Sequence, residues 1–497
     1  MADFPDARKL PHLLPGQQPR RSRDDRISDG RIVTVDVPIV GARSVVWLTG
    51  QLHLFLAAFV LGAPIFVVVS EWLGHRGGDA RYERLARETM KVVSIAYSFT
   101  AAVGAAFGFV LMGAYGGLMT HLFEKLGAAF AAYGALFFVE TALLYIYWYT
   151  WEPLAGRKRL HIAIGIALNV VGTVVMLLMN AVASYMLTPP KSGVTATLWE
   201  LVNNATWSGL NLHRFIANIT LGGFMVALFA AVMFLTTRTD ADRAFYDWMG
   251  FIGNFIGVAT LMLLPLAGYV YAKEIFLYDA TIATFMMADK LSWFFVMQGL
   301  LVSLLFLGAN YYMWLSIRRI AGAEPYLSYQ RPTFAVIVGA SVVWMIPQNF
   351  LPDLTTVASA VAAIQDVVIP ERAAFLGLMM AKALAVTAII VFTFLTYMVY
   401  RRVIGRGVIA WGAIAPQAQY ALVFVSAVTV YTMGLMGAVR ELARQDWHVY
   451  GVLRDTTPYW YTTPLAQTSL MVGIVALMFF ALMAFIFWVG FGLGRAA

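Results

Sequence analysis

The chain has 497 residues, of which 60% are hydrophobic and only 12% are charged, and its mean hydropathy is +0.73. This composition excludes a water-soluble globular protein and indicates a membrane protein with many spans. The net charge of +8 gives no reason to expect a nucleic-acid partner, and the absence of cysteine excludes disulfides and thiolate-bound metal centres, so any metal or haem must be held by His, Met or carboxylate.

Apolar stretches long enough to cross about 30 Å of hydrocarbon recur about eleven times along the chain. Spans in lipid are helices or closed barrels, and stretches of this length predict helices, so we expect an all-α polytopic membrane protein. The predicted spans are 44–72, 89–119, 124–151, 160–187, 211–237, 247–272, 291–318, 333–351, 372–401, 415–440 and 467–494. The shortest, 333–351, contains Pro347, and a re-entrant segment is the alternative there.

The distribution of basic residues predicts the sidedness of the spans. Residues 1–43 are polar and form an N-terminal tail, and eleven spans put the two termini on opposite sides. The loops after the odd-numbered spans hold about twice as many Lys and Arg residues as the other loops, and basic loops face the cytoplasm. This bias predicts an N-terminus outside and a C-terminus inside.

Residues that can bind a metal gather at the predicted outer ends of four spans. They are His53, His213, Met379, Met380 and Glu441. A haem within a helix bundle takes axial ligands from facing helices, and histidine, methionine and carboxylate side chains supply them. Each residue type also has a structural alternative: a histidine can hydrogen-bond a neighbouring helix, a methionine can simply pack, and Glu441 can pair with Arg440 and Arg444.

Segment 441–454 carries the most specific signal in the chain. It reads ELARQDW and, after one residue, VYGVLR. It resembles the E-x-G-R-Q-P-W…V-Y-G-V-L-R segment of subunit I of the cytochrome bd quinol oxidases. His53 followed by Leu-Gly at 61–62, FFVE at 137–140 and His213 resemble other landmarks of that family in the same order. The resemblance covers most of 45–272 and 372–494 and implies bd-oxidase subunit I-like helical bundles.

The resemblance also implies haem ligands, residue by residue. His213 and Met380, with Met379 as the adjacent candidate, would hold a low-spin haem b. His53 and Glu441 would hold two high-spin haems. The expected cofactors are therefore two or three haems b, with haem d as the alternative for one of them.

The residues after Glu441 have an implied role beside these haems. Arg444, Gln445 and Trp447 would lie near the haem propionates. Buried anionic groups need compensating charge and hydrogen bonds, which explains why arginines would accompany a carboxylate ligand at this depth.

The sequence departs from the family pattern at positions that matter for oxygen chemistry. A glutamate of the second span is replaced around Gly113, and one of the third span is replaced by Tyr133. Gly437 stands where the family has a tryptophan, and Asp446 where the motif has proline. Proton delivery for oxygen reduction needs titratable groups or water at membrane depth, so these changes favour an acceptor other than oxygen.

The quinol-binding loop of the family is also altered. Residues 273–371 contain two further apolar spans in place of a long hydrophilic loop. An overlay puts Thr284 and Asp289 at the positions of the family's lysine and glutamate. Quinol oxidation needs a proton acceptor near the outer surface, and Lys273, Glu274 and Asp289 are candidates, with interfacial anchoring as the alternative.

We therefore expect a haem-binding electron-transfer subunit of a respiratory complex in the bacterial cytoplasmic membrane. It would exchange electrons with quinol and pass them to a partner redox subunit. The alternatives are a true quinol:oxygen oxidoreductase and a haem-free scaffold or transporter-like subunit. The expected parts are the tail 1–43, a six-helix part 44–272 with His53 and His213, the region 273–371, and a three-helix part 372–497 with Met380 and Glu441.

Overall fold

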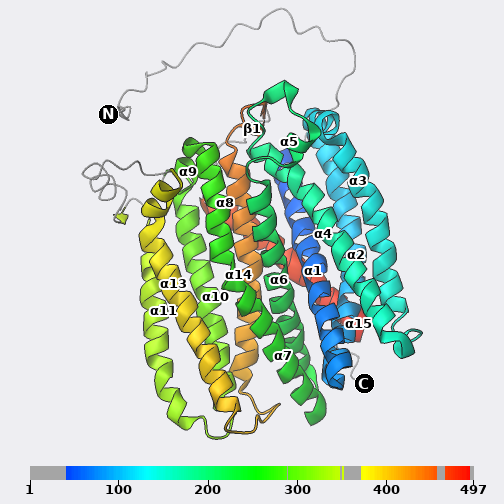
Figure 1. The fold of residues 1–497 in the computed structure, drawn as a ribbon, viewed down its shortest axis with the longest axis vertical. Coiled ribbons are helices and arrows are strands. Elements are labelled where there is room, and N and C mark those ends of the chain that lie inside the picture. Colours follow the sequence, from blue (N-terminus) through cyan, green and yellow to red (C-terminus); the bar gives the residue numbers. More distant parts are fainter. Residues whose placement is uncertain (1–40, 288, 348–349, 352–370, 456–464, 493–497) are drawn as a thin grey trace, which may run out of the picture.

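The computed structural model describes residues 41–287, 289–347, 350–351, 371–455 and 465–492. Long helices run side by side along the molecule (Figure 1). Their bounds are α1 Ala42–Gly77, α2 Ala80–Ala114, α3 Gly116–Tyr149, α4 Lys158–Leu187, α5 Leu198–Val202, α6 Trp207–Thr236, α7 Asp240–Leu261, α8 Leu264–Tyr278, α9 Ala280–Met287, α10 Ser292–Arg318, α11 Gln330–Met345, α13 Glu371–Ile404, α14 Pro416–Ala443 and α15 Leu465–Phe491. The shorter elements are η1 Ala155–Arg157, η2 Gly193–Thr195, η3 Glu324–Tyr329, β1 Trp447–Val449 and β2 Leu453–Arg454.

The described chain contains 10 helical segments that are long and apolar enough to cross a membrane. This confirms the prediction of an all-α polytopic membrane protein. One of these segments contains both α7 and α8. A turn at Met262 and Leu263 separates the two helices, and Pro265 occupies the first turn of α8. Most of the predicted tail 1–43 and part of the region 273–371 lie outside the described residues.

The eighth predicted span, 333–351, corresponds to α11. This helix has 16 residues and ends at Met345, two residues before Pro347. Its length of about 24 Å is shorter than the hydrocarbon core, because an α-helix rises about 1.5 Å per residue. It packs beside α13 and α10 at one flank of the molecule (Figure 1).

Three helices form the centre of the molecule. Helix α6 packs against both α1 and α14, and α1 also packs against α14. Helices α1 to α4 form one bundle; α6, α7–α8, α10 and α14 form a second, and α15 packs against α1, α2 and α14. Helix α13 packs on α11 and α10, outside the second bundle. The central helices therefore bring residues from both ends of the sequence together.

Small residues allow the central helices to approach closely. A Cβ at Gly62 of α1 would collide with the carbonyl of Asn218 in α6, and one at Gly222 would lie 2.9 Å from the backbone nitrogen of Ala63. Gly223 of α6 meets α7 in the same way, with a Cβ position 2.6 Å from the backbone nitrogen of Gly257. Such backbone contacts are a main source of helix association in lipid, where hydrophobic burial adds little.

The two ends of the bundle carry different elements. The β1–β2 hairpin, α5 and α9 lie at one end, which we call the outer end, following the predicted sidedness (Figure 1). The starts of α1 and α6 and the end of α14 lie at this end, so His53, His213 and Glu441 all lie in the outer halves of their helices.

Candidate functional site

Glu441 lies in the last turn of α14, between two arginines. Arg43, at the start of α1, donates from Nη2 to Oε1 of Glu441 at 3.4 Å, and Arg444 donates from Nη2 to Oε2. The Glu441 side chain keeps 32% of its surface exposed, whereas that of Arg444 keeps 5%. The predicted ion pair with Arg444 is therefore present. The long 3.4 Å contact leaves Oε1 the less strongly held of the two oxygens.

The segment after α14 folds back over the outer end. Arg444 donates from Nη1 to the carbonyl of His448 at 2.5 Å, and Gln445 adopts a positive φ of 54°, which is uncommon for a residue other than glycine. Trp447 opens β1 and pairs in register with Arg454. The segment is thus fixed by its own contacts close to Glu441.

Asp446 closes the hairpin that follows. Its carbonyl accepts from the Asp455 N–H at 2.7 Å, and its Oδ2 accepts from Nε and Nη2 of Arg454 at 2.8 and 2.6 Å. Asp455 in turn accepts from Arg43 at 3.3 Å, and its Oδ1 lies 3.4 Å from Nε2 of His448. The aspartate that replaces the motif's proline therefore has a structural role. It holds the hairpin over the start of α1.

Gly437, the other departure next to the motif, also has a packing role. A Cβ at this position would collide with Oε1 of Gln51 in α1. A side chain at this position would displace the buried side chain of Gln51. The glycine brings α14 close to the part of α1 that carries His53.

His53 lies on α1 and faces α2. Its Nδ1 lies 3.2 Å from the carbonyl of Thr100, and its ring packs against Gly104, where a Cβ would lie 2.7 Å from Cε1. In the tautomer that donates from Nδ1, the lone pair is on Nε2. Metal-binding histidines commonly use this arrangement, in which a backbone carbonyl fixes the ring and the other nitrogen binds the metal. The hydrogen bond to a neighbouring helix therefore does not exclude a ligand role.

His213 lies near the start of α6 and faces α8. Its ring centroid is 6.3 Å from that of Tyr271, and a Cβ at Gly268 would lie 3.8 Å from its Cδ2. Gly209, one turn earlier, lets α8 approach, since a Cβ there would lie 3.0 Å from the Cα of Tyr271. The glycines on both helices leave one side of the imidazole free of bulky side chains.

The packing adds a candidate methionine that the sequence did not single out. Met297 on α10 belongs to the same apolar cluster as Tyr271, the neighbour of His213. Met379 and Met380 lie on α13, which packs on α11 and α10 and also contacts α8, whereas α10 packs on α14. The sulfur of Met297 accepts from the hydroxyl of Ser469 at 3.7 Å. Neither Met379 nor Met380 belongs to that cluster in the described part of the chain. The ligand role of Met379 and Met380 stays a prediction, and Met297 is the alternative that the structure adds.

The predicted quinol residues lie around the end of α8 and the start of α10. Lys273 and Glu274 form an ion pair, with 3.0 Å between Nζ and Oε1. Asp289 is exposed, and its carbonyl accepts from the N–H of Ser292 at 3.0 Å. The structure therefore shows an interfacial ion pair and an exposed carboxylate, without bringing all three side chains into one contact.

The hairpin is also anchored to this region. Tyr450 donates to Oδ2 of Asp279 at 3.1 Å, and its N–H donates to the carbonyl of Met186 at 3.0 Å. Burial and the nearby Asp279 carboxylate raise the pKa of Tyr450 to about 12. The hydroxyl therefore remains a donor at neutral pH, and the hairpin stays tied to the α8–α9 junction.

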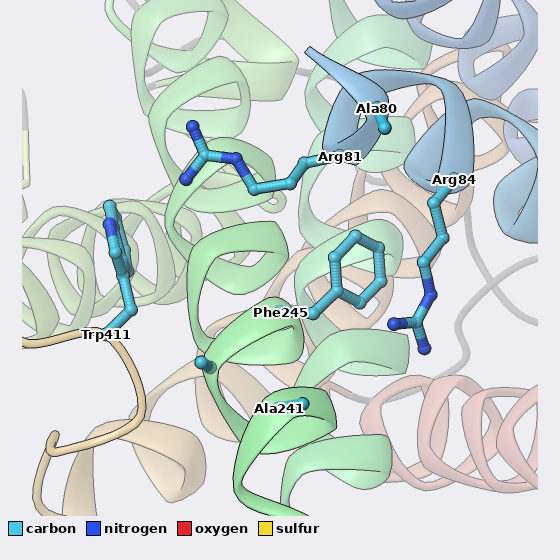
Figure 2. Close-up of a pocket in the computed structure, with 7 residues that line it drawn as sticks. Ala80, Arg81, Arg84, Ala241, Phe245 and Trp411 are labelled. Carbon is cyan, nitrogen blue, oxygen red and sulfur yellow. The ribbon is translucent and has the colours of Figure 1, made fainter.

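A hollow formed by described residues lies at the opposite end. Figure 2 shows it, with a volume of about 330 Å³, around Arg81, Arg84, Phe245 and Trp411. Arg84 pairs with Glu88 and Asp242, both at 2.8 Å, and lies over the ring of Phe245 at 3.9 Å. These cations are already compensated, so this hollow does not extend the outer site.

The donor set at the outer end fits haem. His53, His213 and Glu441 supply two imidazoles and a carboxylate. Nη1 of Arg440 and Nε of Arg444 are buried, and neither has a hydrogen-bond partner among the described residues. A buried guanidinium nitrogen without an acceptor is costly, and the propionates of a haem are acceptors of the right charge.

Comparison with known proteins supports the same relationship. The solved bd oxidase from Geobacillus thermodenitrificans matches over 91% of this chain and 97% of that chain, with a TM-score of 0.51 and 15% sequence identity, which shows a shared fold. No curated protein sequence matches the chain. The sequence model of the family described as cytochrome bd terminal oxidase subunit I matches residues 42–496. The chain therefore belongs to the cytochrome bd terminal oxidase subunit I family.

Proposed function

We propose that this protein is a haem-binding electron-transfer subunit of a respiratory complex in the bacterial cytoplasmic membrane, with its N-terminus outside. It exchanges electrons with quinol near the outer end and passes them to a partner redox subunit. One observation carries the proposal. His53, His213 and Glu441 come from the three central helices and lie in their outer halves, beside buried guanidinium nitrogens of Arg440 and Arg444 that have no acceptor among the described residues.

Two kinds of ligand site follow from this arrangement. His213 holds one haem together with a thioether, which the resemblance assigns to Met380 or the adjacent Met379, with Met297 as the alternative that shares a cluster with Tyr271. Bound iron supplies one-electron transfer, and the protein tunes it through axial ligands and surrounding charge. The α6 and α8 glycines position the imidazole of His213.

His53 and Glu441 hold the other haem or haems. The Thr100 carbonyl orients the His53 ring, and Arg43 and Arg444 orient the Glu441 carboxylate. The proposed complement is two or three haems b, with haem d as the alternative for one.

Quinol would bind beside the α8–α9–α10 corner. Phe276, Phe285 and Met287 pack around the apolar cluster there and offer a surface for the quinol ring. Oxidation of quinol releases protons, and a nearby carboxylate can accept them. The candidate acceptors are Glu274, which is half-buried and paired with Lys273, and Asp289, which is exposed.

A quinol:oxygen oxidoreductase is the second candidate. Glu140 of α3 favours it, because this carboxylate is buried in the same bundle as His53. A Cβ at Gly172 of α4 would lie 2.7 Å from its Oε1. The first bundle therefore keeps one buried carboxylate, although the two family glutamates that correspond to Gly113 and Tyr133 are absent.

Quinol-dependent oxygen uptake by the purified complex separates the two candidates. We expect quinol to reduce the haems with little oxygen uptake, because the second and third spans lack two of the family's glutamates. Robust uptake that is lost in His53→Ala, but kept in a variant of the exposed His75, would establish the oxidase instead. A reduced-minus-oxidised spectrum without a haem band would establish the haem-free scaffold.

A further inference from the structure

Two arginines adjacent in sequence to the proposed ligands form no ion pair within the described part of the chain. Arg214 directly follows His213 on α6, and Arg440 precedes Glu441 on α14. Tyr271 of α8 lies between these two helices: its ring is 6.3 Å from that of His213, and it packs in an apolar cluster with Leu435 and Val439 of α14. Nη1 of Arg440 and the Tyr271 hydroxyl are buried without a hydrogen-bond partner in the described chain.

The nearby carboxylate is already engaged. Glu441 accepts from Arg43 through one oxygen and from Arg444 through the other. A buried guanidinium nitrogen and a buried hydroxyl raise the free energy of the folded state when no acceptor pairs with them. The described residues supply no such acceptor here, and an anion would serve both groups.

The surroundings limit what this anion can be. Tyr271 belongs to a cluster with Leu435, Val439 and Met297, so the molecule that enters must be largely apolar. The ring of Tyr271 also lies 6.3 Å from that of His213. A haem bound by His213 combines an apolar macrocycle with two carboxylates, which matches both requirements.

We infer that Arg214, Arg440 and Tyr271 form an anion pocket that binds the propionates of the haem held by His213. This inference rests on the proposed function. It adds a role for two arginines outside the ligand set. Cations beside a haem favour the reduced state, because reduction lowers the net positive charge of the iron.

Potentiometric titration of the purified complex tests the inference. In Arg440→Gln we expect the midpoint potential of the low-spin haem to become more negative. At a fixed applied potential, the ratio of oxidised to reduced haem should rise roughly tenfold, which corresponds to a shift of about 59 mV for a one-electron couple. Arg440→Lys keeps the charge and should restore most of the potential. Arg87→Gln, in an exposed ion pair with Glu152 at the opposite end, is the matched control and should leave it unchanged.

The outcomes separate this inference from the proposed function. If the purified unmodified protein contains no haem, the proposed function itself is wrong. Haem present, with the same potential in Arg440→Gln as in Arg87→Gln, overturns the propionate pocket alone. The midpoint potential of the unmodified protein could instead change when inorganic phosphate or anionic lipid is added. That result would assign the pocket to a free anion or a lipid headgroup and would also overturn the propionate pocket.

A milder variant covers the case in which Arg440→Gln fails to fold. Tyr271→Phe removes one hydroxyl and changes the side-chain volume little. We expect a smaller shift in the same negative direction. An unchanged potential in this variant, with full haem content, would count against the pocket.

Discussion

His213→Ala is expected to remove one haem from each polypeptide and to leave the other haem or haems in place. The imidazole projects from α6 toward Gly268 and Tyr271 of α8, and alanine at 213 supplies no ligand atom. Loss of an axial ligand from a protein-held haem removes both its affinity and its spectral signature. Pyridine haemochrome quantitation per polypeptide measures the result.

The control for this variant is His75→Ala. His75 is exposed in the last turn of α1, at the end opposite the site, and its loss should leave the haem content unchanged. Equal haem content in the two variants would contradict the assignment of His213.

The same measurement identifies the thioether ligand. If Met297 is the ligand, Met297→Leu should convert or release the His213 haem, while Met380→Leu should retain the native low-spin spectrum. The reverse result would confirm the ligand that the sequence resemblance implied.

Asp247→Asn is expected to destabilise the folded protein by about 3–5 kcal/mol, because it leaves a buried charge without its partner. Asp247 of α7 pairs with Arg319, and their side chains are 0% and 2% exposed. The Gly412 N–H donates to Oδ2 of Asp247 at 2.8 Å, and Arg319 lies over the ring of Trp411 at 4.4 Å. The pair therefore ties the ends of α7 and α10 to the loop before α14.

Thermal unfolding of the detergent-solubilised protein checks this expectation. Glu152→Gln is the control, since Glu152 pairs with Arg87 at the surface, with 77% and 50% of the side chains exposed, and such pairs contribute about 0–1 kcal/mol. Replacing both Asp247 and Arg319 by apolar residues should recover much of the loss. Equal midpoints for Asp247→Asn and Glu152→Gln would show that the pair does not hold these helices together.

The spans could be predicted from the sequence because the bilayer fixes the length of an apolar helix. Their boundaries could not, because helices continue into water where capping and charge allow. Helix α2 begins at Ala80, well before the predicted 89, since Asp79 accepts from the N–H of Arg81 at 3.0 Å and caps the helix. It ends at Ala114, because Tyr115 leaves the helical conformation.

The candidate site was only partly predictable for a different reason. The motif around Glu441 identified the segment, but its partners Arg43 and Asp455 come from the start of α1 and from beyond the hairpin, and only folding brings them together. The alternative Met297 lies in the span 291–318, which the sequence places in an insertion relative to the family. The packing of α10 on α14 depends on tertiary structure and could not be predicted from the sequence. The sequence does contain a Met-x-Gly pattern near the start of this apolar span.

A density map of the purified complex tests the central claim most directly. The account predicts macrocycles between the outer ends of α1, α6 and α14, with iron bound by His53, His213 and Glu441 and with propionates facing Arg440. Side chains alone filling that region, with no macrocycle in the complex, would contradict it.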